Sequence, residues 1–188
     1  LSNGIKIPAA AFGTYKAADG KSAEVIGMAI RAGYRYFDTA SFYGTEEYLA
    51  QAIEESGIPR NSFFITSKLW KEEMGYENAK AAFQRSLERL KTDYLDMYLI
   101  HWPLPDPAYS NWKELDAETW RALEELYRAG KVRAIGLSNF LPHHVDNILA
   151  NCEVPPTVDQ IEYHPGYSQE AAVRYCRDKG ILVQAWSP

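Results

Sequence analysis

Short apolar runs alternate along this chain with longer segments whose apolar residues recur at helical spacing, and this alternation limits the folds available to it. The short runs are rich in β-branched and aromatic residues, as buried strands are. There are seven of them, at Phe12–Tyr15, Tyr34–Phe37, Phe63–Ser67, Leu95–Ile100, Ala134–Leu137, Val158–Glu162 and Ile181–Ala185. Because a helical segment separates each run from the next, the pattern predicts a parallel sheet with right-handed crossovers.

The helical segments each carry a one-sided apolar stripe. The stripes lie at Ala23–Ile30, Leu49–Ile53, Ala79–Leu90, Trp120–Tyr127, Val145–Leu149 and Ala172–Cys176. A glycine follows four of them, at Gly33, Gly57, Gly130 and Gly180, where a helix commonly ends in a left-handed residue. The stretch Trp102–Glu118, rich in Pro, Asp and aromatic residues, is predicted to be a long loop over one end of the sheet.

Two α/β architectures share this alternation: a doubly wound open sheet and a (β/α) barrel. The open sheet would need a glycine-rich phosphate loop after its first strand, and Gly13-Thr14-Tyr15 does not supply one. We therefore predict a single (β/α)8 TIM-barrel domain over residues 1–188, of which strands one to seven are present. A whole barrel takes about 250 residues, and seven strands cannot close it. We expect the molecule to continue beyond Pro188 into a part that is disordered or clipped.

The charge balance disfavours large polyanionic partners. The net charge is -5 at pH 7, the isoelectric point is near 5.4 and no basic run occurs, so neither nucleic acid nor an anionic membrane is expected to bind. The longest apolar stretches, such as Leu95–Ile100, are far shorter than the roughly 20 residues of a membrane helix. Cys152 and Cys176 lack metal-ligand spacing, which favours a reducing compartment, and we expect the cytoplasm.

Polar residues end the predicted strands, at the rim where the catalytic residues of a barrel gather. They are Asp38 with Tyr43 just beyond it, Lys68, His101, Ser138, Asn139, Gln160, Glu162, His164 and Trp186. Taken singly, Asp38 or Asn139 could simply cap a turn, and His101 or Trp186 could be a core residue. Lys68 is harder to explain in that way, because lysines are rarely buried without a partner.

Together these residues suggest proton transfer to an oxygen. A tyrosine has a pKa of about 10, and an adjacent cation such as Lys68 can lower that value by roughly one to three units. Asp38 could hold the ammonium in place, and His101 could orient a substrate oxygen. None of these groups supplies two electrons, so a hydride carrier is required. Trp186 offers a flat face for a nicotinamide ring, and hydrogen bonds to its carboxamide could come from Ser138, Asn139 and Gln160.

Side chains alternate along a strand, which turns these positions into a prediction of register. If Lys68 points into the barrel, so do Thr66 and Phe64. By the same count, Met97, Leu99, Val158 and Gln184 also point inward. Ile65 and Ile100 should then face the helices.

Longer motifs resemble the aldo-keto reductase family over the whole chain. They are Gly13-Thr14-Tyr15, Phe37-Asp38-Thr39-Ala40 with Tyr43-Gly44, Thr66-Ser67-Lys68-Leu69-Trp70, Leu99-Ile100-His101-Trp102-Pro103, Gly136-Leu137-Ser138-Asn139-Phe140, Gln160-Ile161-Glu162-Tyr163-His164-Pro165 and Ala185-Trp186-Ser187-Pro188. The resemblance implies NADPH-dependent reduction of an aldehyde or ketone by a monomer that binds no metal. The Trp at position 186 resembles the branch of the family that contains bacterial diketogluconate reductases and prostaglandin F synthases. This resemblance suggests a small polar carbonyl substrate.

The same resemblance assigns roles to individual residues. Asp38, Tyr43, Lys68 and His101 match the family's catalytic tetrad, with Tyr43 as the proton donor. The cofactor contacts implied are Thr14, Ser138, Asn139, Gln160 and Trp186, and the substrate contacts are Tyr15, Trp70 and Trp102. The choice of NADPH over NADH rests on the family alone, because the segment that holds the 2′-phosphate there follows the eighth strand. The family's leading hairpin strand is expected to be incomplete as well.

Two other functions fit parts of the pattern. A metal-dependent barrel hydrolase or isomerase could use Asp38, His101, Glu162 and His164 as ligands, although the ammonium of Lys68 would compete with the metal. A non-catalytic, cofactor-sensing subunit of the same fold is the second alternative, and the complete tetrad does not distinguish it from an enzyme.

Overall fold

A computed structural model of the chain describes residues 1–17, 22–104 and 109–188. Over these residues the strands form one parallel sheet in sequential order from β1 to β7. The strands are β1 (Phe12–Gly13), β2 (Tyr36–Asp38), β3 (Phe64–Leu69), β4 (Leu95–Ile100), β5 (Val132–Ser138), β6 (Val158–Glu162) and β7 (Leu182–Trp186). The predicted strands are therefore confirmed, with shifts of one or two residues at most of their ends.

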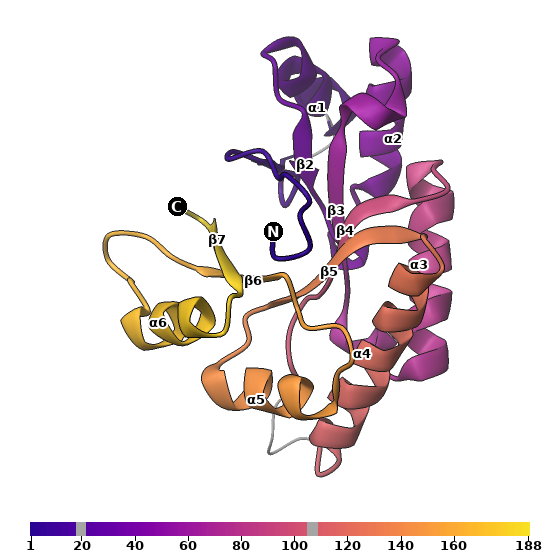
Figure 1. The fold of residues 1–188 in the computed structure, drawn as a ribbon. Helices are drawn as coiled ribbons and strands as arrows, with labels where there is room; N and C mark the ends of the chain where they lie inside the picture. The colour runs from indigo at the N-terminus through magenta and orange to yellow at the C-terminus, as the bar shows by residue number, and fades with distance from the viewer. Residues whose placement is uncertain (18–21, 105–108) are drawn as a thin grey trace.

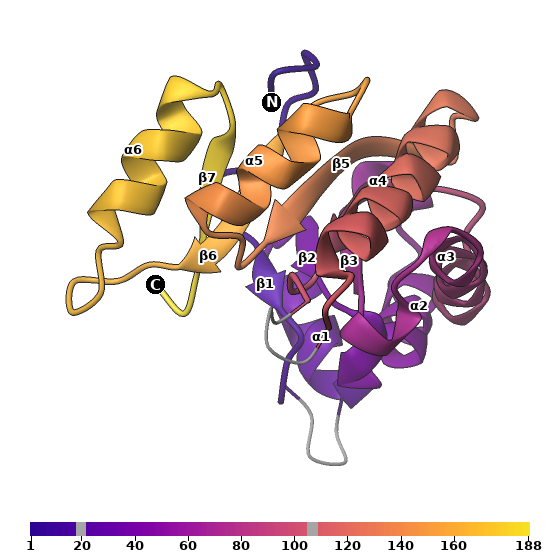
Figure 2. The ribbon, with the colours of Figure 1, turned by 90° about the horizontal axis from the view of Figure 1, so that it is seen from below.

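The helices lie along the outside of the curled sheet (Figures 1 and 2). They are α1 (Ser22–Arg31), α2 (Glu46–Ser56), α3 (Tyr76–Leu90), α4 (Trp112–Arg128), α5 (Pro142–Asn151) and α6 (Glu170–Asp178), with short 3-10 turns η1 (Ser41–Tyr43), η2 (Arg60–Ser62) and η3 (Lys71–Glu73). Each predicted apolar stripe is confirmed as a helix. The four predicted glycines all have left-handed backbone after helix ends, with φ from 66° to 103°. No helix in the described ranges is long and apolar enough to cross a membrane.

The predicted loop over Trp102–Glu118 is wrong in its second half, because α4 already begins at Trp112. The buried face of this first part of α4 includes the fully buried Asp116 beside Trp112. This polar residue on the buried face of the helix interrupts the apolar stripe, so the sequence shows no helical periodicity there. Residues 105–108 of the predicted loop lie outside the described residues.

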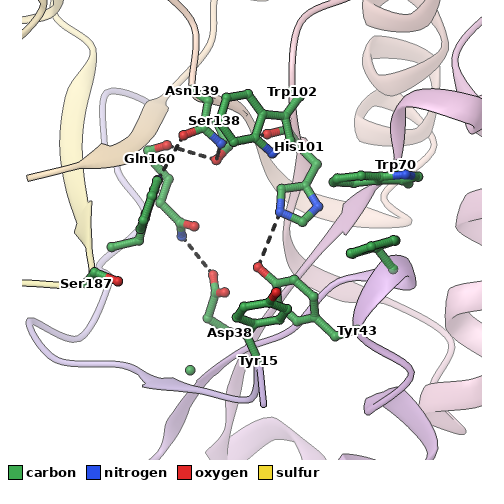
Figure 3. A pocket seen from close by; sticks show the side chains of 13 residues that line it. Tyr15, Asp38, Tyr43, Trp70, His101, Trp102, Ser138, Asn139, Gln160 and Ser187 are labelled. Carbon is green, nitrogen blue, oxygen red and sulfur yellow. Dashed lines mark hydrogen bonds between the residues drawn. The ribbon is translucent and has the colours of Figure 1, made fainter. Parts of the chain in front are cut away.

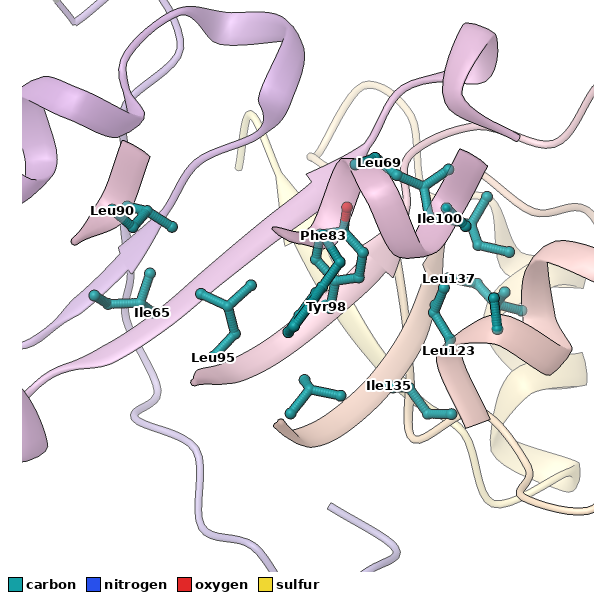
Figure 4. Packing of buried hydrophobic residues seen from close by; sticks show 14 of the residues in the cluster. Ile65, Leu69, Phe83, Leu90, Leu95, Tyr98, Ile100, Leu123, Ile135 and Leu137 are labelled. Atoms are coloured by element: carbon teal, nitrogen blue, oxygen red, sulfur yellow. The ribbon is translucent and has the colours of Figure 1, made fainter. Parts of the chain in front are cut away.

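Two apolar clusters on opposite faces of the sheet confirm the predicted register. The inner cluster contains Tyr36, Phe64, Met97, Leu99, Ala134 and Val158. The outer cluster lies between the sheet and the helices and includes Ile65, Leu69, Tyr98, Ile100 and Leu137, as Figure 4 shows. Because strand residues alternate, this separation also sends Lys68 to the inside.

The strands β5 and β6 approach each other very closely on the inner face. A β-carbon placed at Gly136 would lie 2.5 Å from Cγ1 and 2.7 Å from the carbonyl oxygen of Val158. Only glycine fits between these two strands without moving one of them. Two residues later, Ser138 at the end of β5 pairs with Gln160 of β6.

The first and last strands remain apart in backbone pairing among the described residues, so the sheet is a curled half-barrel. Residues at the N-terminus form no strand over 1–11, yet Leu1, Ile5 and Ile7 pack against the inner cluster. A side-chain hydrogen bond joins β7 to β2, from Nε2 of Gln184 to the hydroxyl of Tyr36 at 2.9 Å. A side-chain contact therefore connects the last strand of the sheet to its second strand across the interior.

Candidate active site

A cavity of about 390 Å³ opens at the carboxyl ends of the strands. It is lined by Gly13, Tyr15, Asp38, Phe42, Tyr43, Trp70, His101, Trp102, Ser138, Asn139, Gln160, Trp186 and Ser187. Most of the predicted site residues line it, and many are labelled in Figure 3. Lys68 and Thr14 do not line it, because both side chains are fully buried beneath its floor.

Lys68 and Asp38 form a buried ion pair under the cavity. The ammonium of Lys68 donates to Oδ1 of Asp38 and, at 3.0 Å, to the carbonyl oxygen of Thr39. Lys68 is 0% exposed and Asp38 is 8% exposed. Removing either charge would leave the other buried without its partner, which is strongly destabilising. The neighbouring strands β2 and β3 thus hold a fixed cation at this point.

Tyr43 lies in η1, directly after the end of β2, and its hydroxyl faces two other predicted catalytic groups. Nζ of Lys68 is 3.4 Å away, and Nε2 of His101 is 3.3 Å away (Figure 3 draws the second contact). Burial raises the pKa of Tyr43 above its ordinary value, and the cation of Lys68 only partly opposes this. The prediction of a lowered pKa is therefore wrong as a net direction, and the phenol carries its proton near neutral pH.

His101 is a neutral imidazole in this site. Burial, together with the nearby charge of Lys68, lowers its pKa to about 3. Trp70 and Tyr43 enclose the ring, with centroids at 5.0 and 5.4 Å. Nδ1 is buried without a hydrogen-bond partner among the described residues. A neutral imidazole can donate a hydrogen bond to an oxygen, but it does not carry the extra proton that an acid catalyst gives away.

Asn139 joins the ends of three strands on the other side of the cavity. It adopts left-handed backbone (φ 64°), which Asn tolerates better than most residues. Its Nδ2 donates to the carbonyl oxygen of His101 at 2.9 Å and to Oγ of Ser138 at 3.1 Å, while Oδ1 accepts from Nε1 of Trp186 at 2.9 Å. These bonds fix the indole of Trp186 at the cavity wall.

Gln160 connects this wall to the ion pair. Its Nε2 donates to Oδ2 of Asp38 at 2.8 Å, as Figure 3 shows. Its main-chain oxygen accepts from Oγ of Ser138 at 2.8 Å. No hydrogen bond from the described residues reaches Oε1 of Gln160, so an acceptor is left at the cavity.

Thr14 supports the floor of the cavity from β1. Its hydroxyl contacts the carbonyl oxygen of Asp38 at 3.2 Å and Oγ1 of Thr45 at 2.8 Å. The side chain is thus already engaged within the protein, and its assignment as a cofactor contact stays a prediction.

Aromatic side chains form the outer wall. Phe42 and Trp70 stack with their ring centroids 4.0 Å apart, and Tyr15 lies 4.9 Å from the ring of Tyr43. Tyr15 and Trp102 are 54% and 42% exposed, which leaves their faces free for a ligand. Sequence reasoning missed Phe42, although a large aromatic residue next to Tyr43 and outside every apolar stripe was a usable signal.

The ligands that a metal enzyme would need are not brought together. Glu162 and His164 contact each other at 3.1 Å, and neither lines the cavity. In the part of the chain that the structure describes, no group of three His, Cys, Asp or Glu residues could hold a metal ion. Both carboxylate oxygens of Asp38 are engaged by Lys68 and Gln160. The described geometry therefore gives the hydrolase alternative no support.

Comparison with known proteins places this site in a family. The chain matches the Aldo/keto reductase family over residues 9–188. The chain belongs to this family. The glyoxal reductase of Bacillus subtilis (strain 168) is 48% identical over 189 residues, covering 100% of this chain and 66% of the relative. The chain thus spans slightly less than two thirds of that curated aldo/keto reductase.

Solved aldo/keto reductases share the fold. The structure from Brucella melitensis has a TM-score of 0.93 at 40% identity and covers 100% of this chain and 71% of that one. The Bombyx mori aldo-keto reductase in complex with NADP has a TM-score of 0.90 at 35% identity, covering 100% and 65%. The half-barrel therefore matches the (β/α)8 fold of this oxidoreductase family, and the predicted fold class is confirmed.

Proposed function

We propose that this aldo/keto reductase chain carries the catalytic centre for NADPH-dependent reduction of a small aldehyde or ketone, with Tyr43 as the proton donor. The observation that carries the proposal is the position of the Tyr43 hydroxyl, within hydrogen-bonding reach of both Lys68 and His101 at a cavity. When bound, reduced nicotinamide supplies the hydride that the carbonyl carbon accepts. The protein must then deliver a proton to the oxygen.

Tyr43 and Lys68 divide that task. Burial keeps the proton on Tyr43 until a stronger base, the developing alkoxide, is present. As the proton leaves, negative charge appears on the phenol oxygen 3.4 Å from the Lys68 ammonium, which stabilises it. Asp38 pairs with the Lys68 ammonium and offsets the cost of burying it. The ion pair therefore favours the charge distribution of the transition state over that of the resting site.

His101 would orient the carbonyl oxygen. Its Nε2 lies 3.3 Å from the Tyr43 hydroxyl, so an oxygen bound between them would contact both groups. Because the imidazole is neutral, His101 contributes a hydrogen bond and leaves the proton transfer to Tyr43. His101 therefore positions the carbonyl, and Tyr43 acts as the acid.

The opposite wall fits a nicotinamide. The indole of Trp186 provides an aromatic face held by Asn139, and Oε1 of Gln160 is an unengaged acceptor suited to the N–H₂ group of a carboxamide. Ser138 and Asn139 supply further oxygens at the same edge. The Bombyx mori relative in complex with NADP supports NADPH as the first cofactor to test.

Substrate size follows from the cavity. A volume of about 390 Å³ with an aromatic wall suits a small carbonyl compound. The name of the Bacillus subtilis glyoxal reductase supports a dicarbonyl such as glyoxal as the first substrate to test. We further propose a monomer acting in the cytoplasm, where both cysteines, which are free in this structure, would stay reduced.

The decisive experiment is turnover by the purified protein with glyoxal and a panel of aldehydes and ketones, each with NADPH and NADH. Consumption of the reduced nicotinamide with formation of the alcohol supports the proposal. The proposal fails if no carbonyl is reduced with either nicotinamide while the protein is folded. Binding of a nicotinamide without any turnover would instead support the cofactor-sensing alternative.

A further inference from the structure

A chain of side-chain hydrogen bonds runs from the catalytic ion pair into the interior of the half-barrel. Nε2 of Gln160 contacts Oε1 of Gln184 at 3.1 Å as well as Asp38. Nε2 of Gln184 contacts the hydroxyl of Tyr36 at 2.9 Å, and that hydroxyl contacts Oγ1 of Thr66 at 3.0 Å. The chain thus crosses from β6 and β7 to β2 and β3 beneath the cavity.

The charge of Asp38 fixes the direction of the bonds that the two glutamine amides make. An ionised carboxylate only accepts hydrogen bonds, so the amide nitrogen of Gln160 must face Asp38. That nitrogen also donates to Gln184, which must therefore turn its oxygen toward Gln160 and its nitrogen toward Tyr36. Tyr36 then accepts from Gln184, and its hydroxyl forms the last bond of the chain with the hydroxyl of Thr66.

The direction of the chain decides what Gln160 offers to the cavity. With both protons of Nε2 used inside the protein, the amide can present only Oε1 to a ligand. We propose that Gln184 and Tyr36 are positioning residues, which hold the Gln160 amide so that it accepts from the nicotinamide carboxamide and keeps Asp38 directed at Lys68. This inference rests on the proposed function and extends it to two residues outside the cavity lining of the site.

The surroundings of Tyr36 support a role for its hydroxyl beyond packing. Its ring lies 4.8 Å from that of Phe64 in an edge-to-face contact, and the side chain is 1% exposed. Burial raises the pKa of Tyr36, so its hydroxyl stays protonated over the working pH range. Phenylalanine would keep the ring contact and remove only the hydroxyl from the chain. The substitution therefore separates orientation from packing.

The test compares Tyr36→Phe with Tyr98→Phe. Tyr98 is an equally buried tyrosine on β4, but its ring packs on Phe83 at 5.0 Å on the helix side of the sheet, away from this chain. Three quantities are measured for each protein: hydrogen exchange of the Gln160 and Gln184 side-chain amides by NMR, the NADPH dissociation constant, and kcat for glyoxal against pH. Gln184→Leu, which removes both bonds of the central residue, is the second variant.

We expect Tyr36→Phe to speed exchange of both amides and to weaken NADPH binding by about 5- to 10-fold, the effect of one buried hydrogen bond. The pH profile should also shift, because Gln160 would be held less firmly against Asp38. Gln184→Leu should show larger changes, and Tyr98→Phe should leave all three quantities at their wild-type values. Should Gln184→Leu fail to fold, Tyr36→Phe alone carries the test.

The inference is overturned if Tyr36→Phe changes only the melting temperature and leaves amide exchange and NADPH affinity unchanged. It is also overturned if Tyr98→Phe weakens NADPH binding as much, since the effect would then be general destabilisation. If the wild-type protein neither binds nor oxidises NADPH, the proposed function fails, while amide exchange in the unliganded variants still decides whether Tyr36 holds Gln160.

Discussion

A buried carboxylate with a cationic partner lies at the amino ends of the strands and another at their carboxyl ends, but only the second adjoins the candidate active site. At the amino ends of the strands, Asp96 accepts from Arg60 at 2.9 Å, from Arg133 at 2.7 Å and from the backbone of Ile65 at 3.0 Å. Both oxygens are engaged, and the two arginines extend toward solvent. At the carboxyl ends, Asp38 is equally engaged, but its cation is fully buried beneath a cavity.

The two carboxylates differ in which other groups their cationic partners contact. Lys68 reaches a third group, the hydroxyl of Tyr43, and next to it the buried Nδ1 of His101 has no partner among the described residues. Arg60 instead contacts main-chain oxygens and the hydroxyl of Thr92, and the side chain of Arg133 is half exposed to solvent. A buried ion pair alone therefore does not indicate a catalytic site. An incompletely engaged group beside a cavity does.

Lys68→Met should damage both activity and stability. It removes the charge that stabilises the Tyr43 phenolate and leaves the Asp38 carboxylate buried without a cation, so we expect kcat to fall about 10²-fold and stability to fall by about 2–4 kcal/mol. Because Lys68 opposes the rise in the Tyr43 pKa, any residual activity should persist to higher pH. Denaturant unfolding and pH–rate profiles measure these effects. Lys91→Met, which breaks an exposed pair with Glu54, is the control, and equal losses in it would contradict the comparison.

Tyr43→Phe should damage activity alone. Loss of the proton donor should lower kcat by about 10²-fold or more, while the NADPH dissociation constant and the melting temperature stay close to wild type. Steady-state kinetics and cofactor titration measure these quantities. Tyr48→Phe, at an exposed tyrosine of α2, is the matched control. A Tyr43→Phe protein with wild-type turnover would remove Tyr43 from the mechanism.

Asp96→Asn should damage stability alone. It breaks two ion pairs at the amino end, but the arginines can turn to solvent, so we expect a loss of about 1–3 kcal/mol. Because the cavity lies at the other end of the strands, kcat should be unchanged. Urea unfolding and turnover of the same sample measure the two quantities. A fall in kcat of tenfold or more in Asp96→Asn, comparable to that in Asp38→Asn, would show that the two ends are coupled.

Asp159 differs from Asp38 and Asp96, because no cation pairs with its buried carboxylate in the described residues. We expect it to affect only the pH dependence of stability. Burial raises its pKa to about 7, against about 3.9 in an unfolded chain. The folded state therefore binds the extra proton, and Asp159 should lower stability as the pH rises from about 4 to about 7. Asp159→Asn should flatten that decline, raising the melting temperature at pH 8 by a few degrees and changing it little at pH 4. Asp93→Asn, at an exposed carboxylate, should leave the decline in place. An equally steep decline in Asp159→Asn would show that other groups cause it.

Much of this arrangement could be predicted from the sequence because it depends on local periodicity. The alternation around Lys68 predicted which residues face inward, and the polar residues that end the strands predicted the rim of the cavity. The start of α4 was missed because Asp116 interrupts its apolar stripe. The direction of the Tyr43 pKa was missed because it depends on how much burial outweighs one cation, a balance that only a three-dimensional arrangement determines.

Contacts between distant segments were likewise invisible in the sequence. Gln184 and Tyr36 are far apart in the chain, and neither belongs to a motif that suggests pairing. Phe42 was overlooked because its stacking on Trp70 requires η1 to lie beside the residue that links β3 to η3. Sequence patterns thus indicated which residues reach the site, while their bonding partners followed only from the fold.

The absence of a side chain at Gly136 has a consequence for the geometry of the whole cavity. Val158 occupies the space where a β-carbon would stand, so β5 packs against β6 here only because residue 136 has no side chain. Two residues further along, this spacing sets the gap between Ser138 and Gln160 and, through Asn139, the position of the Trp186 indole. The polar wall of the pocket therefore stands directly above a strand contact that admits no side chain at residue 136.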